Sequence, residues 1–462
     1  MPASTSLLRL YRREIGATIQ LSYPIVIAQL GSVLMNVAAN MMVGRLGKAA
    51  IASVGIGNSI YILVAVLGMG TLAVLGPQVG TARGRSDTEE CRKLLQTAIR
   101  LGLGIGIVLA AVLGGVAATF DVFRQTPEVT ALAKTYLSIT AVSVIPMMLF
   151  MGLKYYTDGL SYTRVAMIIT ITGLLLDIFF NWTLIYGNLG FPALGVKGAG
   201  IAVLLTRLYM AGAMYFYLRT SPLFRTYWER FSGPISPYIN RVLRLGLPGG
   251  LQYFFEVGAF SGSAVMAGWM GTASLAAHEI AISLAALAYM VASGNAAAGS
   301  IRVGVAVGQG SRAGVIRAGT AALVIAVAFM SLTCLLFVLA HEPLIKLYIQ
   351  KDPEVLAIAT TLLIIAGIFQ VSDGVQVAGL GILRALSDVN VPTVATLFAY
   401  WVIGIPLGYW LAFSLGMGVQ GIWYGLLAGL TASATLLTVR FYTLSRKIRL
   451  EVPAQTPSAV SS

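Results

Sequence analysis

The chain has 462 residues, of which 57% are hydrophobic and only 10% are charged. An average soluble domain carries roughly 25% charged residues, so this chain lacks the charge to cover a water-exposed surface. Its stock of about 263 apolar residues is enough for about a dozen membrane-spanning helices of roughly 20 residues each. The composition therefore excludes a string of soluble domains and predicts an all-α polytopic membrane protein.

The net charge is +14, from 31 basic and 17 acidic residues. In a soluble protein such an excess would suggest nucleic-acid binding, but in a membrane protein basic residues gather in cytoplasmic loops, so we expect no nucleic-acid partner. Cys91 and Cys334 lie in different surroundings, which argues against a disulfide or a metal pair. The two histidines lie away from both cysteines, so we expect no zinc, haem or other cofactor. The first apolar run is too long for a cleavable signal and predicts the first span.

Twelve apolar stretches, separated by turn residues or by charges, are predicted to span the membrane. In chain order they are 17–42, 51–80, 95–119, 133–155, 165–187, 196–217, 242–268, 276–302, 318–340, 355–382, 392–414 and 418–441.

The basic residues between these spans predict the topology. With a cytoplasmic N-terminus, 23 Lys and Arg residues fall on the inside, 7 fall on the outside, and Arg207 lies within a span. Positive residues accumulate on the cytoplasmic side of a membrane protein. We therefore expect a multi-pass membrane protein with both termini in the cytoplasm.

The chain also repeats itself at a nearly constant offset, close to half its length. The matching segments are 21–24 and 245–248, 78–80 and 302–304, 159–161 and 385–387, and 195–198 and 418–421. These matches predict two six-helix bundles, at 1–220 and 242–445, joined by a cytoplasmic linker at 221–241 and followed by a tail at 446–462. Because six is even, the repeats are parallel, as in secondary transporters that rock one half against the other. No Gly-Lys-Ser/Thr phosphate loop is present, which argues against ATP as the direct energy source.

Ionisable side chains within predicted spans are costly in hydrocarbon, so they point to function. In the C-terminal half, Glu256 follows Gln252 by one helical turn, and Asp373 precedes Gln376 by three residues. Two acids converging on one cavity can bind Na⁺, share a proton or hold an organic cation. Each could instead be a structural carboxylate bonded to a neighbouring helix. Tyr253 stands beside Glu256 in an aromatic run, and aromatic faces suit lipophilic cations.

The N-terminal half carries a separate polar group. Asp177 and Asn181 are four residues apart and should share one helix face, and Asn40 could join them. For Asp177 we favour a role in binding the cation or the substrate over a structural one, and for both Asn residues the two roles are equally supported. Arg207 could neutralise an acid or extend toward the membrane surface, and we favour a structural role. His278 and Glu279 at the outer start of a span are interpreted as an interfacial pair.

The order of several motifs resembles the multidrug and toxic compound extrusion (MATE) family, closest to its bacterial NorM-type branch. The motifs that carry the resemblance are Pro24 and Pro248, residues 254–257, 276–278, 300–304 and 373–376, and Asn181-Trp182 before Tyr186-Gly187. The resemblance covers nearly the whole chain. It implies a V-shaped pair of six-helix bundles and efflux of cationic aromatic compounds in exchange for Na⁺ or H⁺. It also implies that Glu256 and Asp373 form the cation-binding pair, and that they would be the Na⁺ ligands if Na⁺ is the coupling ion.

Three positions depart from the family pattern. Asn40 stands where the family usually has Asp, while Asp177 stands where many NorM-type members have Asn. Compared with the family, the acid of the N-terminal half thus lies in the fifth helix instead of the first. Relatives that couple transport to protons through an acid in the first helix therefore give little guidance on the coupling mechanism of this chain. Phe369 replaces a Tyr found in some relatives, which removes one possible oxygen ligand for Na⁺.

Together with this resemblance, the sequence predicts a monomeric multidrug antiporter of a bacterial inner membrane, not an enzyme. Its expected partners are cationic aromatic molecules, membrane lipids and either Na⁺ or H⁺. The resemblance favours Na⁺ slightly. The alternative is a flippase for lipid-linked oligosaccharides, which should have a cationic cavity, whereas Arg207 is the only basic residue predicted at mid-span. A membrane-embedded enzyme would need a metal-binding acid cluster or a His-based site. A purely structural scaffold is disfavoured because acids within the membrane are energetically costly and would serve no purpose in it.

Overall fold

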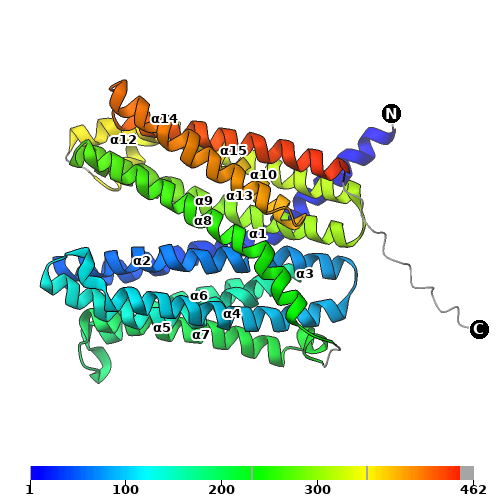
Figure 1. Cartoon of the computed structure of the whole chain (residues 1–462), viewed down its shortest axis with the longest axis horizontal. Coiled ribbons are helices and arrows are strands. Elements are labelled where there is room, and N and C mark those ends of the chain that lie inside the picture. Colours follow the sequence, from blue (N-terminus) through cyan, green and yellow to red (C-terminus); the bar gives the residue numbers. More distant parts are fainter. Residues whose placement is uncertain (1, 230–232, 350–351, 448–462) are drawn as a thin grey trace, which may run out of the picture.

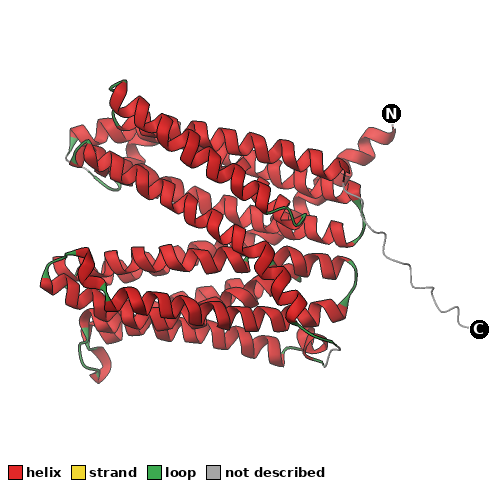
Figure 2. Ribbon diagram, in the orientation of Figure 1, coloured by secondary structure: helices red, strands yellow, loops and turns green. Residues whose placement is uncertain are grey.

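The computed structural model describes residues 2–229, 233–349 and 352–447, and these residues form helices and connecting loops (Figure 2). The helices of the N-terminal half are α1 (Pro2–Gly44), α2 (Lys48–Leu72), α3 (Leu75–Gly84), α4 (Thr88–Ala118), α5 (Pro127–Gly159), α6 (Thr163–Tyr186) and α7 (Gly195–Thr220), with short 3₁₀ turns η1 (Phe120–Phe123), η2 (Asn188–Gly190) and η3 (Pro222–Trp228). Those of the C-terminal half are α8 (Ser236–Trp269), α9 (Thr272–Gly308), α10 (Arg312–Leu339), α11 (His341–Lys346), α12 (Pro353–Ala385), α13 (Asn390–Phe398), η4 (Ala399–Gly404), α14 (Ile405–Tyr409), η5 (Trp410–Ser414) and α15 (Val419–Lys447).

Each of the twelve predicted spans coincides with one helix or with a broken helix, so the predicted all-α fold is confirmed. Within the described residues, eleven helical segments are long and apolar enough to cross a membrane. The remaining predicted span, α8, has 34 residues and carries polar side chains, among them Gln252 and Glu256. These side chains are buried inside the protein, so the helix does not need to be apolar on that face.

The helices differ from the predicted spans in four places. The span at 51–80 is broken at Ala73–Val74 into α2 and α3, and α11 occupies part of a predicted loop. The eleventh span contains two π-helical stretches, η4 and η5. Pro406 follows η4 and has no N–H to continue the helical ladder, which accounts for the local widening. The predicted linker at 221–241 contains η3 and the start of α8; residues 230–232 of the linker and 448–462 of the tail lie outside the described residues.

The helices gather into two bundles that Figure 1 shows one above the other. In the lower bundle α5 packs against α4 and α7, and in the upper bundle α12 packs against α9, α10 and α15. The first helix of each half contacts both bundles. α1 packs against α6 and also against α9, and α8 packs against α2 and also against α13. These two crossing helices are therefore the main physical connection between the halves.

The contact between the halves has an approximate two-fold symmetry. A Cβ atom on Gly84 would lie 2.3 Å from the carbonyl oxygen of Val305, and one on Gly308 would lie 2.1 Å from that of Thr81. The offset that relates 302–304 to 78–80 makes Gly308 the equivalent of Gly84, and Val305 the equivalent of Thr81. Each glycine therefore contacts the residue of the other half that is equivalent to its partner's contact, as a two-fold axis requires. The contacts of Gly80 with Ile301 and of Gly304 with Pro77 follow the same rule. The three-dimensional contacts thus confirm the repeat found in the sequence.

These contacts lie toward one end of the molecule, where α1 begins and α15 ends; we call it the terminal end. Two polar contacts between the halves reinforce it. Arg302 of α9 pairs with Glu14 of α1 at 2.6 Å between Nη2 and Oε1, and Gln78 Nε2 donates to Ser387 Oγ at 3.4 Å. Toward the opposite end the two bundles diverge (Figure 1). The topology prediction places the terminal end in the cytoplasm.

Candidate functional site between the two halves

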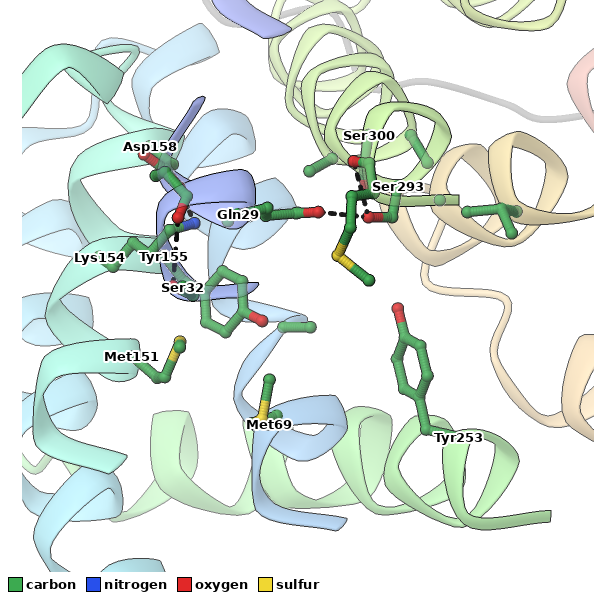
Figure 3. Close-up of a pocket in the computed structure, with 18 of the residues that line it drawn as sticks. Gln29, Ser32, Met69, Met151, Lys154, Tyr155, Asp158, Tyr253, Ser293 and Ser300 are labelled. Atoms are coloured by element: carbon green, nitrogen blue, oxygen red, sulfur yellow. Dashed lines mark hydrogen bonds and ion pairs between the residues drawn. The ribbon is translucent and has the colours of Figure 1, made fainter. Parts of the chain in front are cut away.

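A cavity of about 370 Å³ lies between the two halves, a size typical of small-molecule sites. Residues of α1, α2, α3, α5 and α6 line one side, and residues of α8, α9 and α12 line the other (Figure 3). Its polar and charged lining residues are Gln29, Ser32, Asn36, Lys154, Tyr155, Asp158, Thr170, Tyr253, Glu256, Tyr289, Ser293, Ser300 and Arg384. The remaining lining is largely aliphatic, with several methionines.

The wall of the N-terminal half carries a buried ion pair on α5. Lys154 and Asp158 are one helical turn apart, and their Nζ and Oδ2 atoms lie 2.9 Å from each other. The side chains are only 8% and 3% exposed, and Asp158 Oδ1 has no partner among the described residues. The sequence counts Lys154 among the basic residues on the cytoplasmic side, and the structure shows that this side chain is buried within α5, which continues to Gly159, and lines the cavity.

The wall of the C-terminal half carries an acid, a base and two tyrosines. Glu256 on α8 is 5% exposed, and its Oε2 atom has no hydrogen-bond partner among the described residues. Arg384 projects from the last turn of α12, and its guanidinium carbon lies 5.7 Å from the centre of the Tyr253 ring. Tyr253 and Tyr289 supply aromatic surface beside the carboxylate. The predicted Glu256 and Tyr253 therefore both reach the cavity.

Asp373 lies within the C-terminal bundle, 3% exposed, and is not among the residues that line the cavity. The prediction that both acids open onto one cavity is therefore corrected: Glu256 lines it, and Asp373 interacts electrostatically with Glu256 from behind the wall. The reason is the packing of α12, whose neighbouring Gly374 fits closely against Met330 of α10.

The surroundings of these two acids contain several polar atoms without partners. Tyr400, whose hydroxyl lies against Glu256, also donates to Gln376 Oε1 at 2.9 Å. Gln370 Nε2 donates to the carbonyl oxygen of Ala285 at 3.2 Å. Among the described residues, Gln252 Nε2, Gln370 Oε1 and Gln376 Nε2 are buried without a hydrogen bond. Buried polar groups normally have partners, so this cluster is suited to receive a proton, water or a small cation.

The polar group of the N-terminal half is separate from the cavity. Asp177 accepts hydrogen bonds from Asn181 Nδ2 at 2.9 Å and from Thr206 Oγ1 at 3.1 Å. Arg207 lies near Asp177, donates to Ser143 Oγ at 2.6 Å and places its guanidinium carbon 4.3 Å from the centre of the Tyr61 ring. The predicted shared face of Asp177 and Asn181 is confirmed. Asn40 is exposed, and no hydrogen bond joins it to that pair among the described residues.

The predicted interfacial pair at the start of α9 is also corrected. His278 is buried and accepts a hydrogen bond from Trp423 Nε1 at Nδ1, 3.1 Å away, while Glu279 is exposed. Sequence reasoning further missed Asp158, Arg384 and Tyr400 as possible site residues. The helical spacing of Lys154 and Asp158 could have revealed the first. The repeat could have revealed the second, because Arg384 is separated from Asp158 by the same offset that separates Ala385 from Gly159.

The comparisons with known proteins agree with this architecture. The MatE family profile matches twice, at residues 24–183 and 248–410, once in each half. The chain belongs to the MatE family. The chain is 35% identical over 438 residues to a protein of Rhizobium meliloti named "Probable multidrug resistance protein NorM", with 94% of each chain covered. A protein of the same name from Mesorhizobium japonicum is 36% identical over 440 residues, again with 94% of each covered. These matches confirm the family resemblance and its NorM-type branch.

Solved structures share the fold. The eukaryotic MATE transporter AtDTX14 superposes with a TM-score of 0.85 at 19% identity, covering 95% of this chain and 99% of that one. A mutant of the Vibrio cholerae MATE transporter VcmN superposes with a TM-score of 0.87 at 16% identity, covering 95% and 99%. At such identities the likeness concerns the fold, and it confirms the predicted pair of six-helix bundles.

Proposed function

We propose that this MatE protein is a secondary multidrug efflux antiporter that exports organic cations in exchange for Na⁺ or H⁺. The observation that carries the proposal is the Glu256 carboxylate on the wall of a cavity between two repeated halves, because its Oε2 atom has no hydrogen-bond partner among the described residues. Tyr253 and Tyr289 beside it provide aromatic faces for a lipophilic cation. The names of the NorM relatives support the multidrug part of the proposal.

The drug and the coupling ion would be exchanged because they compete for the same negative charge. A proton or Na⁺ that reaches Glu256 and Asp373 would neutralise the pair and weaken its hold on a cationic drug. A ligand shifts a conformational equilibrium only by its differential affinity for the two states. The halves touch at the terminal end and diverge at the other, so binding that favours rocking would expose the cavity to each side in turn.

Transport assays on the two acids test the proposal. In proteoliposomes with an imposed ion gradient, Glu256→Gln and Asp373→Asn should each abolish coupled export of a cationic dye. Glu279→Gln is the matched control, because Glu279 is an exposed acid on α9 outside the cavity lining. Monodisperse elution of each purified variant shows that folding is intact. Coupled export that persists in both cavity variants would refute the assignment.

The coupling ion is a separate part of the proposal, in which Na⁺ is the first choice. Among the described residues, no group of three His, Cys, Asp or Glu side chains could hold a metal ion. A Na⁺ at Glu256 and Asp373 would therefore need oxygens from amides, hydroxyls or the backbone, such as Gln370 Oε1. Dye export driven by a Na⁺ gradient at clamped pH supports Na⁺, whereas export driven only by a pH gradient identifies H⁺.

The flippase alternative ranks lower because the cavity is balanced in charge. The structure adds the bases Lys154 and Arg384 to the cavity, yet Asp158 and Glu256 offset them. A lipid-linked pyrophosphate would need an excess of positive charge. We further propose an inner-membrane location with the terminal end in the cytoplasm, and a monomer as the functional unit.

A further inference from the structure

Arg384 is the base of the cavity whose charge has no close partner among the described residues. The other cavity base, Lys154, is paired with Asp158 on its own helix. The side chain of Arg384 forms neither a hydrogen bond nor an ion pair within 4.0 Å with any residue that the structure describes, and its guanidinium group lies over the ring of Tyr253. It lines the cavity together with Glu256, and the two groups interact only at longer range.

A guanidinium group in such a position has unused binding capacity. Its five N–H donors form a planar fork that matches a carboxylate, and it is always charged. Glu256, on the same wall, has an unused acceptor oxygen. Within the part of the chain that the structure describes, the wall thus presents an anion and a cation that are both available to a ligand, with the aromatic ring of Tyr253 beside them.

We propose that Arg384 binds an anionic group of the transported molecule, such as a carboxylate, while Glu256 binds its cationic group. This inference rests on the proposed export function and adds a residue that selects for compounds carrying both charges. Tyr155 and Tyr253 extend into the cavity from the two halves (Figure 3), so an aromatic body can lie between the two charged ends.

Two other roles for Arg384 make different predictions. A base in the last turn of a helix stabilises the helix dipole, and a base near Glu256 also offsets its charge. If Arg384 had only one of these roles, its mutation would change the affinity for a ligand with a carboxylate and for the same ligand without one by the same factor. A pair of dyes that differ only in this group therefore separates binding from support.

The test uses rhodamine B, which carries a free carboxylate and a cationic xanthene, and its ethyl ester, which is a simple cation. Binding of both dyes to the full-length protein in lipid nanodiscs is measured by fluorescence polarisation for the native chain and for Arg384→Gln. The variant should bind the acid about tenfold more weakly, the loss expected for one charge-assisted interaction. It should bind the ester equally well or more tightly, because a repelling charge is gone.

Arg384→Lys should recover part of the acid binding, since it keeps the charge but loses the planar fork. Arg317→Gln is the matched control, because Arg317 lies on α10 in the same half and does not line the cavity; it should leave both dissociation constants unchanged. The proposal is overturned if Arg384→Gln changes the binding of both dyes by the same factor, or if the native chain binds only the ester.

Failure of the export function has a different signature. If native proteoliposomes export neither dye under any ion gradient, the proposed function itself is wrong. If they export the ester and the acid-to-ester ratio does not depend on Arg384, only the present inference falls.

Discussion

The two halves of this protein repeat one six-helix fold but treat their buried acids differently. In the N-terminal half, Asp177 receives hydrogen bonds from Asn181 and Thr206 and has Arg207 nearby. In the C-terminal half, Glu256 has an unpartnered oxygen, and no hydrogen bond to Asp373 is present among the described residues. A compensated acid can simply be part of the structure, whereas an uncompensated one is stabilised by what it binds.

At the contact between them, the two halves have nearly the same structure. Gly84 and Gly308 make exchanged contacts with Val305 and Thr81, and each approach leaves no room for a Cβ atom. The repeat is thus preserved at the contact between the halves, and it has diverged at the charges. This division predicts that mutations at the contact act symmetrically, and that mutations of the acids do not.

The largest effect is expected at this contact. Gly84→Val and Gly308→Val should each reduce transport at least about tenfold, because added methyl groups would overlap a backbone carbonyl that approaches a Cβ to 2.3 Å or 2.1 Å. Dye export from proteoliposomes is the measurement. Gly104→Val in α4 and Gly262→Val in α8 are controls, since nothing lies within 4 Å of a Cβ at either site. A severe loss in one variant and none in its symmetry mate would contradict the two-fold contact.

The next largest effect is expected on stability, when the positive charge near Asp177 is removed. Arg207→Met removes the nearby positive charge and should destabilise the protein by about 2 kcal/mol, because a buried carboxylate loses a favourable interaction with a charge that lies beyond ion-pair distance. Thermal unfolding of the purified protein measures the loss. The double variant Arg207→Met with Asp177→Asn should recover most of the stability, since the uncompensated charge is gone. Additive losses in the double variant would show that Arg207 stabilises the fold through Ser143 and Tyr61 alone.

The sequence predicts the architecture well because it depends on composition and on spacing. Long apolar runs indicate the spans, and the constant offset between the repeated segments reappears as exchanged contacts in space. The i, i+4 spacing of Asp177 and Asn181 predicts correctly that they share one helix face, where the structure shows a hydrogen bond between them. Such features require only the geometry of one helix or of one repeat.

The candidate site is predicted less completely because it depends on where helices end and how they rotate. Lys154 falls at the end of a predicted span, and only the continuation of α5 to Gly159 places Asp158 one helical turn beyond it as its partner. Asp373 and Glu256 are both mid-span, but the packing of α12 keeps Asp373 out of the cavity. Tyr400 resembles a membrane-interface aromatic in sequence, yet it is buried and bonded to Gln376. None of these facts can be read from periodicity alone.

A smaller effect is expected from the tyrosine that supports the C-terminal acids. Tyr400→Phe removes the hydroxyl that donates to Gln376 and lies against Glu256. A hydrogen bond of this kind contributes about 1 kcal/mol, which corresponds to roughly fivefold in an equilibrium constant. The concentration of coupling ion that gives half-maximal dye export should shift by that factor, with little change in maximal export. An unchanged ion dependence would separate Tyr400 from the ion site.

The smallest effect is expected from Asp177→Asn, which tests the comparison most directly. The amide keeps an oxygen that can accept from Thr206, and Arg207 remains held by Ser143 and Tyr61. Coupled export should therefore change by less than about twofold, whereas Glu256→Gln is expected to abolish it. Both acids are almost fully buried, at 2% and 5% exposure, so burial does not account for the difference. If Asp177→Asn also abolished coupling, hydrogen-bond compensation would not distinguish a structural acid from an ion-binding one, and ion coupling would involve both halves.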